Sequence, residues 1–331
     1  MLAQVLPRFG DVSAFELRDL PIPALRPGCA VVEIAATSVN HVDCKLRQHG
    51  SALAPELPAV LGADFSGRIR ALADDVFGFE IGDAVYGLGA GLRGAHGGAL
   101  AQYLLIDARV LAHKPQALDF RSAAAMPLAA ITAWEGLQRA GIQAGRHVFV
   151  RGGTGGVGHL TIQFARHFGA HVTATASTPE RMAVARELGA HVVIGTSEAA
   201  LHEAVAATAG GHGFDIAFDA SGRSDFPSLA AATRYNGHVV AIAGRGPRDL
   251  EPLFVRGQSL HFVFVLIPTL HGTGRAAHGE ILELVAALVD SGAVRPLVDP
   301  RRFTLAEAGA AHRCVESGKP LGKVVIEVAD L

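Results

Sequence analysis

The sequence predicts an α/β protein in which a β-rich region is joined to a doubly wound parallel sheet. From residue 1 to about 120, short alternating or β-branched runs are separated by proline, glycine and aspartate, which is typical of strands and irregular loops. From about residue 121, strand-like and helix-like segments alternate, and this alternation predicts a parallel sheet with helices on both faces. A glycine-rich turn at 152–158 joins one of these strands to a helix.

Length and composition narrow the possible classes of protein. The chain has 331 residues, which suits two domains, and its 50% hydrophobic and 18% charged residues exclude a disordered chain. The net charge of −2 and the lack of a basic stripe argue against nucleic-acid binding. The longest apolar run, 262–268, is too short to span a membrane, so we expect no membrane association. Three scattered cysteines and no signal-peptide pattern predict a cytoplasmic protein.

The elements are expected in a definite order. In the β-rich region, strands are expected at 30–34 and 103–106. Beyond it, helices are expected at 121–141, 157–168, 179–188, 198–208 and 226–234, and strands at 147–150, 172–176, 192–194, 216–218 and 238–243. The final part is expected to hold a strand from 260, a loop over 271–279, a helix over 280–291, a last short helix and a strand over 323–328.

The turn after the strand at 147–150 carries the pattern Gly153-x-Gly155-x-x-Gly158 and leads directly into a helix. In such a turn one glycine allows the sharp bend, one lets the backbone approach a pyrophosphate, and one lets helix and strand pack closely. The helix N-terminus then favours the negative diphosphate. The sequence therefore predicts a dinucleotide site, with Thr154, Gly156 and Val157 as further loop residues.

The residues after the next strand favour NADPH over NADH. An NAD site usually has an acidic residue at the tip of this strand, but here the tip is followed by Ser177 and Thr178, with Arg181 close behind. These three side chains are donors suited to a 2′-phosphate. Glu180 is the counter-evidence, because an inward-pointing carboxylate would instead bind the ribose and repel the phosphate.

Short motifs along nearly the whole chain, taken together and in order, indicate a known family. The motifs lie at 40–47, 58–67, 82–87, 130–134, 152–158 with Gln163, 214–219 and 322–325. With them the chain resembles the zinc-independent quinone oxidoreductases (zeta-crystallin-like) of the medium-chain dehydrogenase/reductase superfamily. The resemblance implies a GroES-like catalytic domain formed by 1–120 and 268–331, and a Rossmann dinucleotide-binding domain formed by 121–267. It also implies an active-site cleft between the domains and a homodimer or homotetramer.

The resemblance gives no support for a metal. Zinc alcohol dehydrogenases of the superfamily hold catalytic zinc at positions that match Asn40, Ala63 and Leu128 here, and none of these is a usual zinc ligand. A structural zinc lobe would need four closely spaced cysteines, and no cysteine lies between Cys44 and Cys314. We therefore expect no metal.

Without a metal, the expected reaction is hydride transfer from NADPH to an acceptor that is already electrophilic, such as a quinone or an α,β-unsaturated carbonyl. The resemblance implies catalytic roles for Asn40 and Asp43, and Lys45 is a further candidate donor. Further residues are expected to contact the cofactor: Thr132, Ala243, Gly244, Phe264, Val265 and Lys323.

Several alternatives stay open on the sequence alone. Asn40 either donates to the developing oxyanion or caps a turn and touches only the cofactor, and Lys45 is either a proton donor or a solvated side chain. The whole protein could bind NADPH without physiological catalysis, or be a zinc-type alcohol dehydrogenase.

Overall fold

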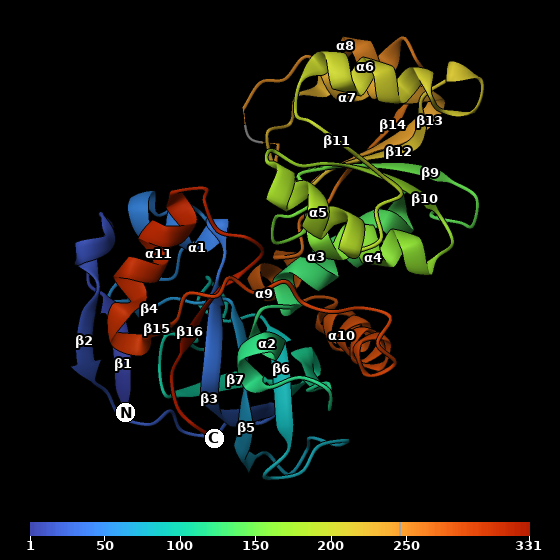
Figure 1. Cartoon of the computed structure of the whole chain (residues 1–331). Helices are drawn as coiled ribbons and strands as arrows, with labels where there is room; N and C mark the ends of the chain where they lie inside the picture. The colour runs from blue at the N-terminus through green and yellow to red at the C-terminus, as the bar shows by residue number, and fades with distance from the viewer. Residues whose placement is uncertain (245) are drawn as a thin grey trace. The chain divides into compact units, whose positions relative to one another are not determined.

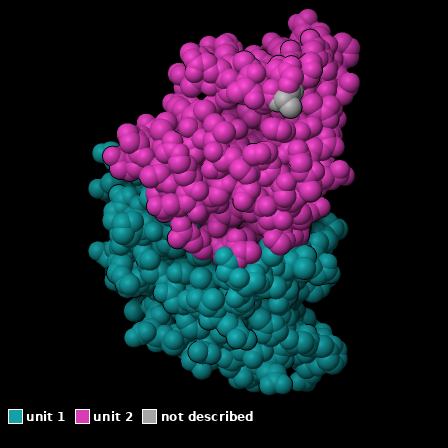
Figure 2. All heavy atoms as spheres, turned by 45° about the vertical axis from the view of Figure 1, so that its right-hand side comes forward, with its two compact units in different colours: residues 1–128, 265–292, 296–331 teal, residues 129–264, 293–295 magenta. Residues whose placement is uncertain are grey.

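A computed structural model describes residues 1–244 and 246–331 (Figure 1). The chain divides into two compact units, coloured separately in Figure 2. Unit 1 consists of Met1–Leu128, Val265–Gly292 and Pro296–Leu331, and unit 2 of Ala129–Phe264 and Ala293–Arg295. The domain limits expected from the sequence, between 120 and 121 and between 267 and 268, stay a prediction.

Unit 2 is built on a six-stranded sheet in the order β11-β10-β9-β12-β13-β14, and every neighbouring pair is parallel. The strands are β9 (His147–Arg151), β10 (His171–Thr175), β11 (Val192–Ile194), β12 (Phe214–Asp219), β13 (Thr233–Ala241) and β14 (Ser259–Phe262). The strand order reverses beside β9, so the loop after β9 lies at the switch point where α/β sheets bind their ligands. The predicted doubly wound parallel sheet is confirmed.

Helices cover both faces of this sheet (Figure 1). One group is α3 (Pro127–Arg139), α4 (Gly158–His167) and α5 (Pro179–Glu187), and the other is α6 (Glu198–Ala206), α7 (Phe226–Ala232) and α8 (Glu251–Phe254). The second group packs its apolar side chains, among them Leu201, Leu229 and Leu253, onto Phe149 and Val239 of the sheet. Burial of such side chains supplies most of the favourable free energy of folding.

Unit 1 is a β-rich unit around the long strand β3 (Cys29–Val39). Its main sheet has the order β15-β16-β3-β5-β6-β8, with β7 also paired to β3, and a smaller sheet has the order β2-β1-β4. The remaining strands are β1 (Leu2–Leu6), β2 (Glu16–Asp19), β4 (Ala59–Val60), β5 (Asp64–Leu72), β6 (Ala84–Leu88), β7 (Tyr103–Asp107), β8 (Leu111–His113), β15 (Phe303–Thr304) and β16 (Val324–Glu327). The helices of this unit are α1 (His41–His49), α2 (Phe120–Ala124), α9 (Ile267–His271), α10 (Arg275–Asp290) and α11 (Ala308–Glu316).

Three predicted boundaries were wrong. The helix expected over 121–141 is two helices, because Pro127 starts a new one. The helix expected over 226–234 ends at Ala232, since Thr233 pairs with Phe214 of β12 and begins β13. The loop expected over 271–279 is short, because α10 begins at Arg275.

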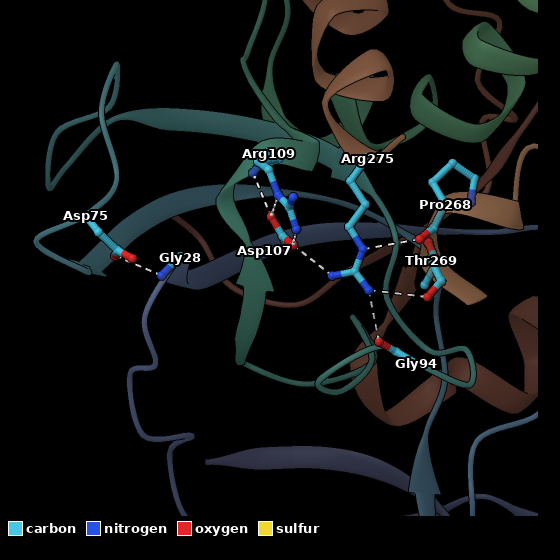
Figure 3. Close-up of polar contacts among 8 residues, drawn as sticks. All are labelled: Gly28, Asp75, Gly94, Asp107, Arg109, Pro268, Thr269 and Arg275. Atoms are coloured by element: carbon cyan, nitrogen blue, oxygen red, sulfur yellow. Dashed lines mark hydrogen bonds and ion pairs between the residues drawn. The ribbon is translucent and has the colours of Figure 1, made fainter. Parts of the chain in front are cut away.

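Arg275, the first residue of α10, connects this helix to other parts of unit 1 (Figure 3). Its guanidinium forms an ion pair with Asp107 at 2.8 Å and donates to the carbonyl oxygens of Pro268, Thr269 and Gly94. These contacts join α10 to β7, to α9 and to the glycine-rich loop that contains Gly94. A Cβ on Gly94 would lie 2.5 Å from the Thr269 carbonyl oxygen, so only glycine fits at this contact.

No helix in the described ranges, 1–244 and 246–331, is long and apolar enough to cross a membrane.

Candidate active site

The glycine-rich loop of unit 2 is a tight turn between β9 and α4. After β9, the N–H of Gly153 donates to the Thr175 carbonyl oxygen at 3.0 Å, and Gly152 adopts a positive φ of 83°. A Cβ on Gly158 would lie only 2.0 Å from the Gly152 carbonyl oxygen, so helix α4 can start this close to the turn only with glycine. The binding of a nucleotide at this turn, by the N-terminus of α4, stays a prediction.

The donors that follow β10 lie beside this loop. Arg181 Nη1 donates to the hydroxyl of Thr154 at 3.2 Å, which brings a guanidinium to the glycine-rich turn. Ser177 and Thr178 are exposed, and Thr178 caps α5 by accepting from the Arg181 N–H. The backbone N–H of Glu180 and the Thr178 hydroxyl lower the pKa of the Glu180 carboxyl. The Glu180 carboxylate is thus engaged at the start of its own helix.

The other residues expected at the cofactor lie in several elements. Thr132 is buried on α3, while Ala243 and Gly244 lie two and three residues after the end of β13. Phe264 and Val265 follow β14, and Phe264 is 41% exposed whereas Val265 is buried. Their contact with a nucleotide stays a prediction.

In unit 1 the strongest polar feature is a buried cluster of Asn40, Asp64, Lys323 and Ser38. The Lys323 ammonium donates to Asn40 Oδ1 and pairs with Asp64 Oδ2 at 3.1 Å. Asn40 Nδ2 and Ser38 Oγ donate to the same Asp64 oxygen at 2.8 and 2.7 Å. The backbone N–H of Leu128, in the first turn of α3, donates to Asp64 Oδ1 at 2.7 Å. All four side chains of the cluster are buried.

Strand register brings this cluster together from distant parts of the chain. Ser38 of β3 pairs with Asp64 of β5, and Val39 pairs with Val324 of β16. Antiparallel pairing therefore sets Lys323, just before β16, beside Asn40, just after β3. Asn40 is also the residue that precedes α1, so the strand ends and the helix begins at the cluster.

Two further residues predicted as catalytic lie on α1. Asp43 is buried, and its Oδ2 accepts the Asn40 backbone N–H at 2.8 Å, as a capping residue does. Burial, reinforced by the charge of Asp64, raises the pKa of Asp43 to about 7. Within the described chain, Asp43 Oδ1 has no hydrogen-bond partner. Lys45 is exposed on the same helix.

Two protein families match different parts of the chain. Residues 26–116 match the family described as alcohol dehydrogenase GroES-like domain, and residues 156–283 match the family described as zinc-binding dehydrogenase. A solved structure of an alcohol dehydrogenase superfamily protein from Novosphingobium aromaticivorans is 39% identical, with a TM-score of 0.93, and the match covers 99% of this chain and 100% of that one.

Three named relatives indicate the part of the superfamily to which the chain is similar. The chain is 31% identical to 2-methylene-furan-3-one reductase of Solanum lycopersicum over 96% of this chain and 76% of the relative. It is 30% identical to NADPH-dependent alkenal/one oxidoreductase, chloroplastic, of Arabidopsis thaliana, over 98% and 79%. It is 26% identical to quinone oxidoreductase of Sus scrofa, over 96% and 95%. The chain belongs to the medium-chain dehydrogenase/reductase superfamily, with the quinone oxidoreductases and enone reductases.

One matching family of this superfamily is described as zinc-binding, and the residues of this chain do not fit a zinc site. The three positions inferred for metal ligands hold Asn40, Ala63 and Leu128, of which only Asn40 has a polar side chain. Both Asn40 and the adjacent Asp64 carboxylate are already bound to the Lys323 ammonium. Throughout 1–244 and 246–331, no three His, Cys, Asp or Glu side chains are grouped so that they could hold a metal ion.

Asp64 and Ser38 were not among the residues that the sequence predicted for the site. The partners of Asp64 are 24 to 259 residues away in the chain, so the cluster depends on which strands pair. The signal in the sequence was a carboxylate at the start of one strand and a lysine just before another. Such a pair indicates a buried ion pair once both strands are known to flank β3.

Proposed function

We propose that the protein is an NADPH-dependent oxidoreductase that transfers a hydride to a quinone or to an α,β-unsaturated carbonyl. The observation that carries the proposal is the Asn40–Asp64–Lys323 cluster. Around Asn40, which occupies one of the three positions inferred for metal ligands, it offers an amide and the Lys323 ammonium as donors. Such donors stabilise negative charge on an acceptor oxygen but polarise a simple carbonyl less strongly than zinc does. An acceptor that is already electron-poor suits them best.

The residues of unit 2 fit the cofactor. Gly153, Gly155 and Gly158 shape the turn for the diphosphate, and Arg181, with Ser177 and Thr178, would hold the 2′-phosphate. When bound, NADPH supplies the hydride. The name of the Arabidopsis relative, an NADPH-dependent alkenal/one oxidoreductase, supports this choice of nucleotide.

The residues of unit 1 supply the polar chemistry. Reduction of a quinone or an enone leaves negative charge on the acceptor oxygen, and we assign the stabilisation of that charge to Asn40 Nδ2 and Lys323 Nζ. Asp43, with its pKa of about 7, and the exposed Lys45 are the candidates to return a proton. The printed names of the tomato and pig relatives, a furanone reductase and a quinone oxidoreductase, support acceptors of this class.

We further propose a cytoplasmic homodimer or homotetramer. All three cysteines, Cys29, Cys44 and Cys314, are buried and free, as expected in a reducing compartment. Light scattering on the purified protein measures the oligomer size. A monomer at micromolar concentration would contradict this part of the proposal.

The function is tested by following NADPH oxidation at a fixed nucleotide concentration with a panel of quinones, 2-alkenals and simple ketones. We expect turnover with quinones or alkenals and none with simple ketones. NADPH binding without turnover of any member of the panel would instead indicate a binding protein without catalysis. Turnover of simple ketones that needs added zinc would indicate a zinc-type alcohol dehydrogenase.

A further inference from the structure

Asp64 accepts hydrogen bonds from four segments of unit 1. The donors are Ser38 of β3, Asn40 at the start of α1, the Leu128 N–H of α3 and Lys323 beside β16, at 2.7, 2.8, 2.7 and 3.1 Å. Its side chain is completely buried. A buried carboxylate with this many donors is fixed in position, because any rotation breaks several charge-assisted hydrogen bonds.

The Asp64 carboxylate and the Lys323 ammonium together fix the orientation of the Asn40 amide. An ammonium can only donate, so the Asn40 atom that faces Lys323 must be the oxygen. An ionised carboxylate can only accept, so the atom that faces Asp64 must be the nitrogen. A flipped Asn40 amide would place its N–H groups against the Lys323 ammonium and its oxygen against the Asp64 carboxylate. Asn40 therefore has one orientation, which is set by its neighbours.

The remaining hydrogen-bonding capacity of the cluster consists of donors. Asn40 Nδ2 has two N–H groups and gives one to Asp64, and the Lys323 ammonium has three and gives one each to Asn40 and Asp64. Among the described residues, the Asn40 side chain also hydrogen-bonds the Asp43 carboxyl, whereas the Lys323 ammonium keeps one N–H beyond its bonds to Asn40 and Asp64. A donor held in this way, beside the Asn40 amide, matches an oxygen that gains negative charge.

We propose that Asp64 is the positioning residue of the active site: it holds the Asn40 amide and the Lys323 ammonium so that the N–H groups it leaves open bind the acceptor oxygen. This role rests on the proposed function, since it names the groups that serve the acceptor. Asp64 itself acts only through Asn40 and Lys323.

The kinetic test compares Asp64→Asn, Lys323→Met and the double variant with a matched control, Ser66→Ala. Ser66 lies two residues along the same strand, is equally buried, and donates to the Phe120 carbonyl oxygen outside the cluster. For an alkenal or quinone, we expect Asp64→Asn and Lys323→Met each to lower kcat on the order of 100-fold. In Asp64→Asn the KM for NADPH should change less than about threefold, and Ser66→Ala should leave kcat within about twofold.

The double variant separates positioning from folding. If Asp64 acts through Lys323, then Asp64→Asn has little further effect on kcat in the Lys323→Met background. In the otherwise wild-type protein, Asp64→Glu should keep part of the kcat that Asp64→Asn loses. Additive losses in the double variant would overturn the proposal. So would an Asp64→Asn protein that keeps its kcat and loses only thermal stability, as Ser66→Ala is expected to do.

A spectroscopic measurement tests the same role without turnover. In 1H–15N spectra, the Asn40 side-chain amide is identified by its absence in Asn40→Ala. We expect its protons to exchange slowly with solvent in the wild type and in Ser66→Ala, and to exchange at least about tenfold faster in Asp64→Asn. Fast exchange in the wild type would overturn the positioning role. A slow amide together with no turnover of any acceptor would instead overturn the proposed function.

Discussion

Arg181 Nη1 donates a hydrogen bond to Thr154 Oγ1 at 3.2 Å, and this contact joins the first turn of α5 to the glycine-rich loop. In the proposed nucleotide site, this contact would hold the guanidinium near a phosphate on the adenosine ribose. Thr154 is buried, so the loop side of the contact is firmly placed. The nucleotide preference of the protein should depend on this arginine.

Arg181→Ala is therefore expected to weaken the binding of NADPH far more than the binding of NADH. A hydrogen bond to a charged group contributes about 1.5–3 kcal/mol, so the Kd for NADPH should rise about 10- to 100-fold while that for NADH stays within about threefold. Arg186→Ala, an exposed arginine on the same helix, serves as the control. Titration of intrinsic fluorescence or calorimetry measures both constants. Equal losses for the two nucleotides would show that Arg181 does not read the 2′-phosphate.

Gly158→Ala is expected to damage the nucleotide loop. The added Cβ would lie 2.0 Å from the Gly152 carbonyl oxygen, so the turn and the start of α4 must move apart. Overpacking of this kind costs about 1–3 kcal/mol, and NADPH binding should weaken with it. Gly195→Ala is the control, because no atom lies within 4 Å of its added Cβ. Thermal melting with and without NADPH measures both effects, and an unchanged nucleotide-induced rise in Tm would contradict the expectation.

The buried Asp43 should make the protein less stable as pH rises. Its folded pKa of about 7 lies above the ordinary aspartate value of 3.8, so folding favours the protonated carboxyl. That stabilisation is complete below about pH 4 and is lost as the pH rises through 7, with a total on the order of a few kcal/mol. Asp43→Asn should therefore be more stable than the wild type at about pH 8 and similar to it at about pH 4. Urea midpoints at the two pH values measure the difference, with the exposed Asp74→Asn as the control.

His312 should have the opposite dependence. Burial, with a smaller effect from the charge of Arg47, lowers the pKa of His312 to about 3, and within the described residues its Nδ1 has no hydrogen-bond partner. Since the unfolded chain binds the proton more tightly, stability is lost as the pH falls from about 6.5 toward 3. His312→Leu should lose less stability than the wild type between pH 7 and pH 4. If denaturant midpoints of the two proteins fall in parallel, His312 is not the group responsible; His202→Asn, on the surface of α6, is the control.

Removal of metal should leave the activity unchanged. Asn40, Ala63 and Leu128 cannot replace a set of zinc ligands, and the Lys323 ammonium already binds the Asn40 and Asp64 oxygens. Dialysis against a strong chelator is expected to leave kcat with the best acceptor within about twofold of the untreated enzyme. Elemental analysis of the untreated protein provides the second measurement, and stoichiometric zinc would contradict the expectation.

The sequence was informative where function depends on local pattern. The glycine spacing at 153–158 and the alternation of strands and helices predicted the nucleotide loop and the parallel sheet, because both patterns depend on residues that are close together in the sequence. The cluster around Asp64 was not predicted, since it depends on the register of β3 with β5 and β16.

The contacts of Arg275 have a consequence for natural variation. Its planar guanidinium binds one carboxylate and three carbonyl oxygens, and a lysine cannot form hydrogen bonds in all these directions. A missense change there would remove the hydrogen bonds that join α10 to three separate segments, far along the chain from Asn40 and Arg181. Cells carrying such an allele should accumulate less folded enzyme, while each surviving molecule works at its normal rate.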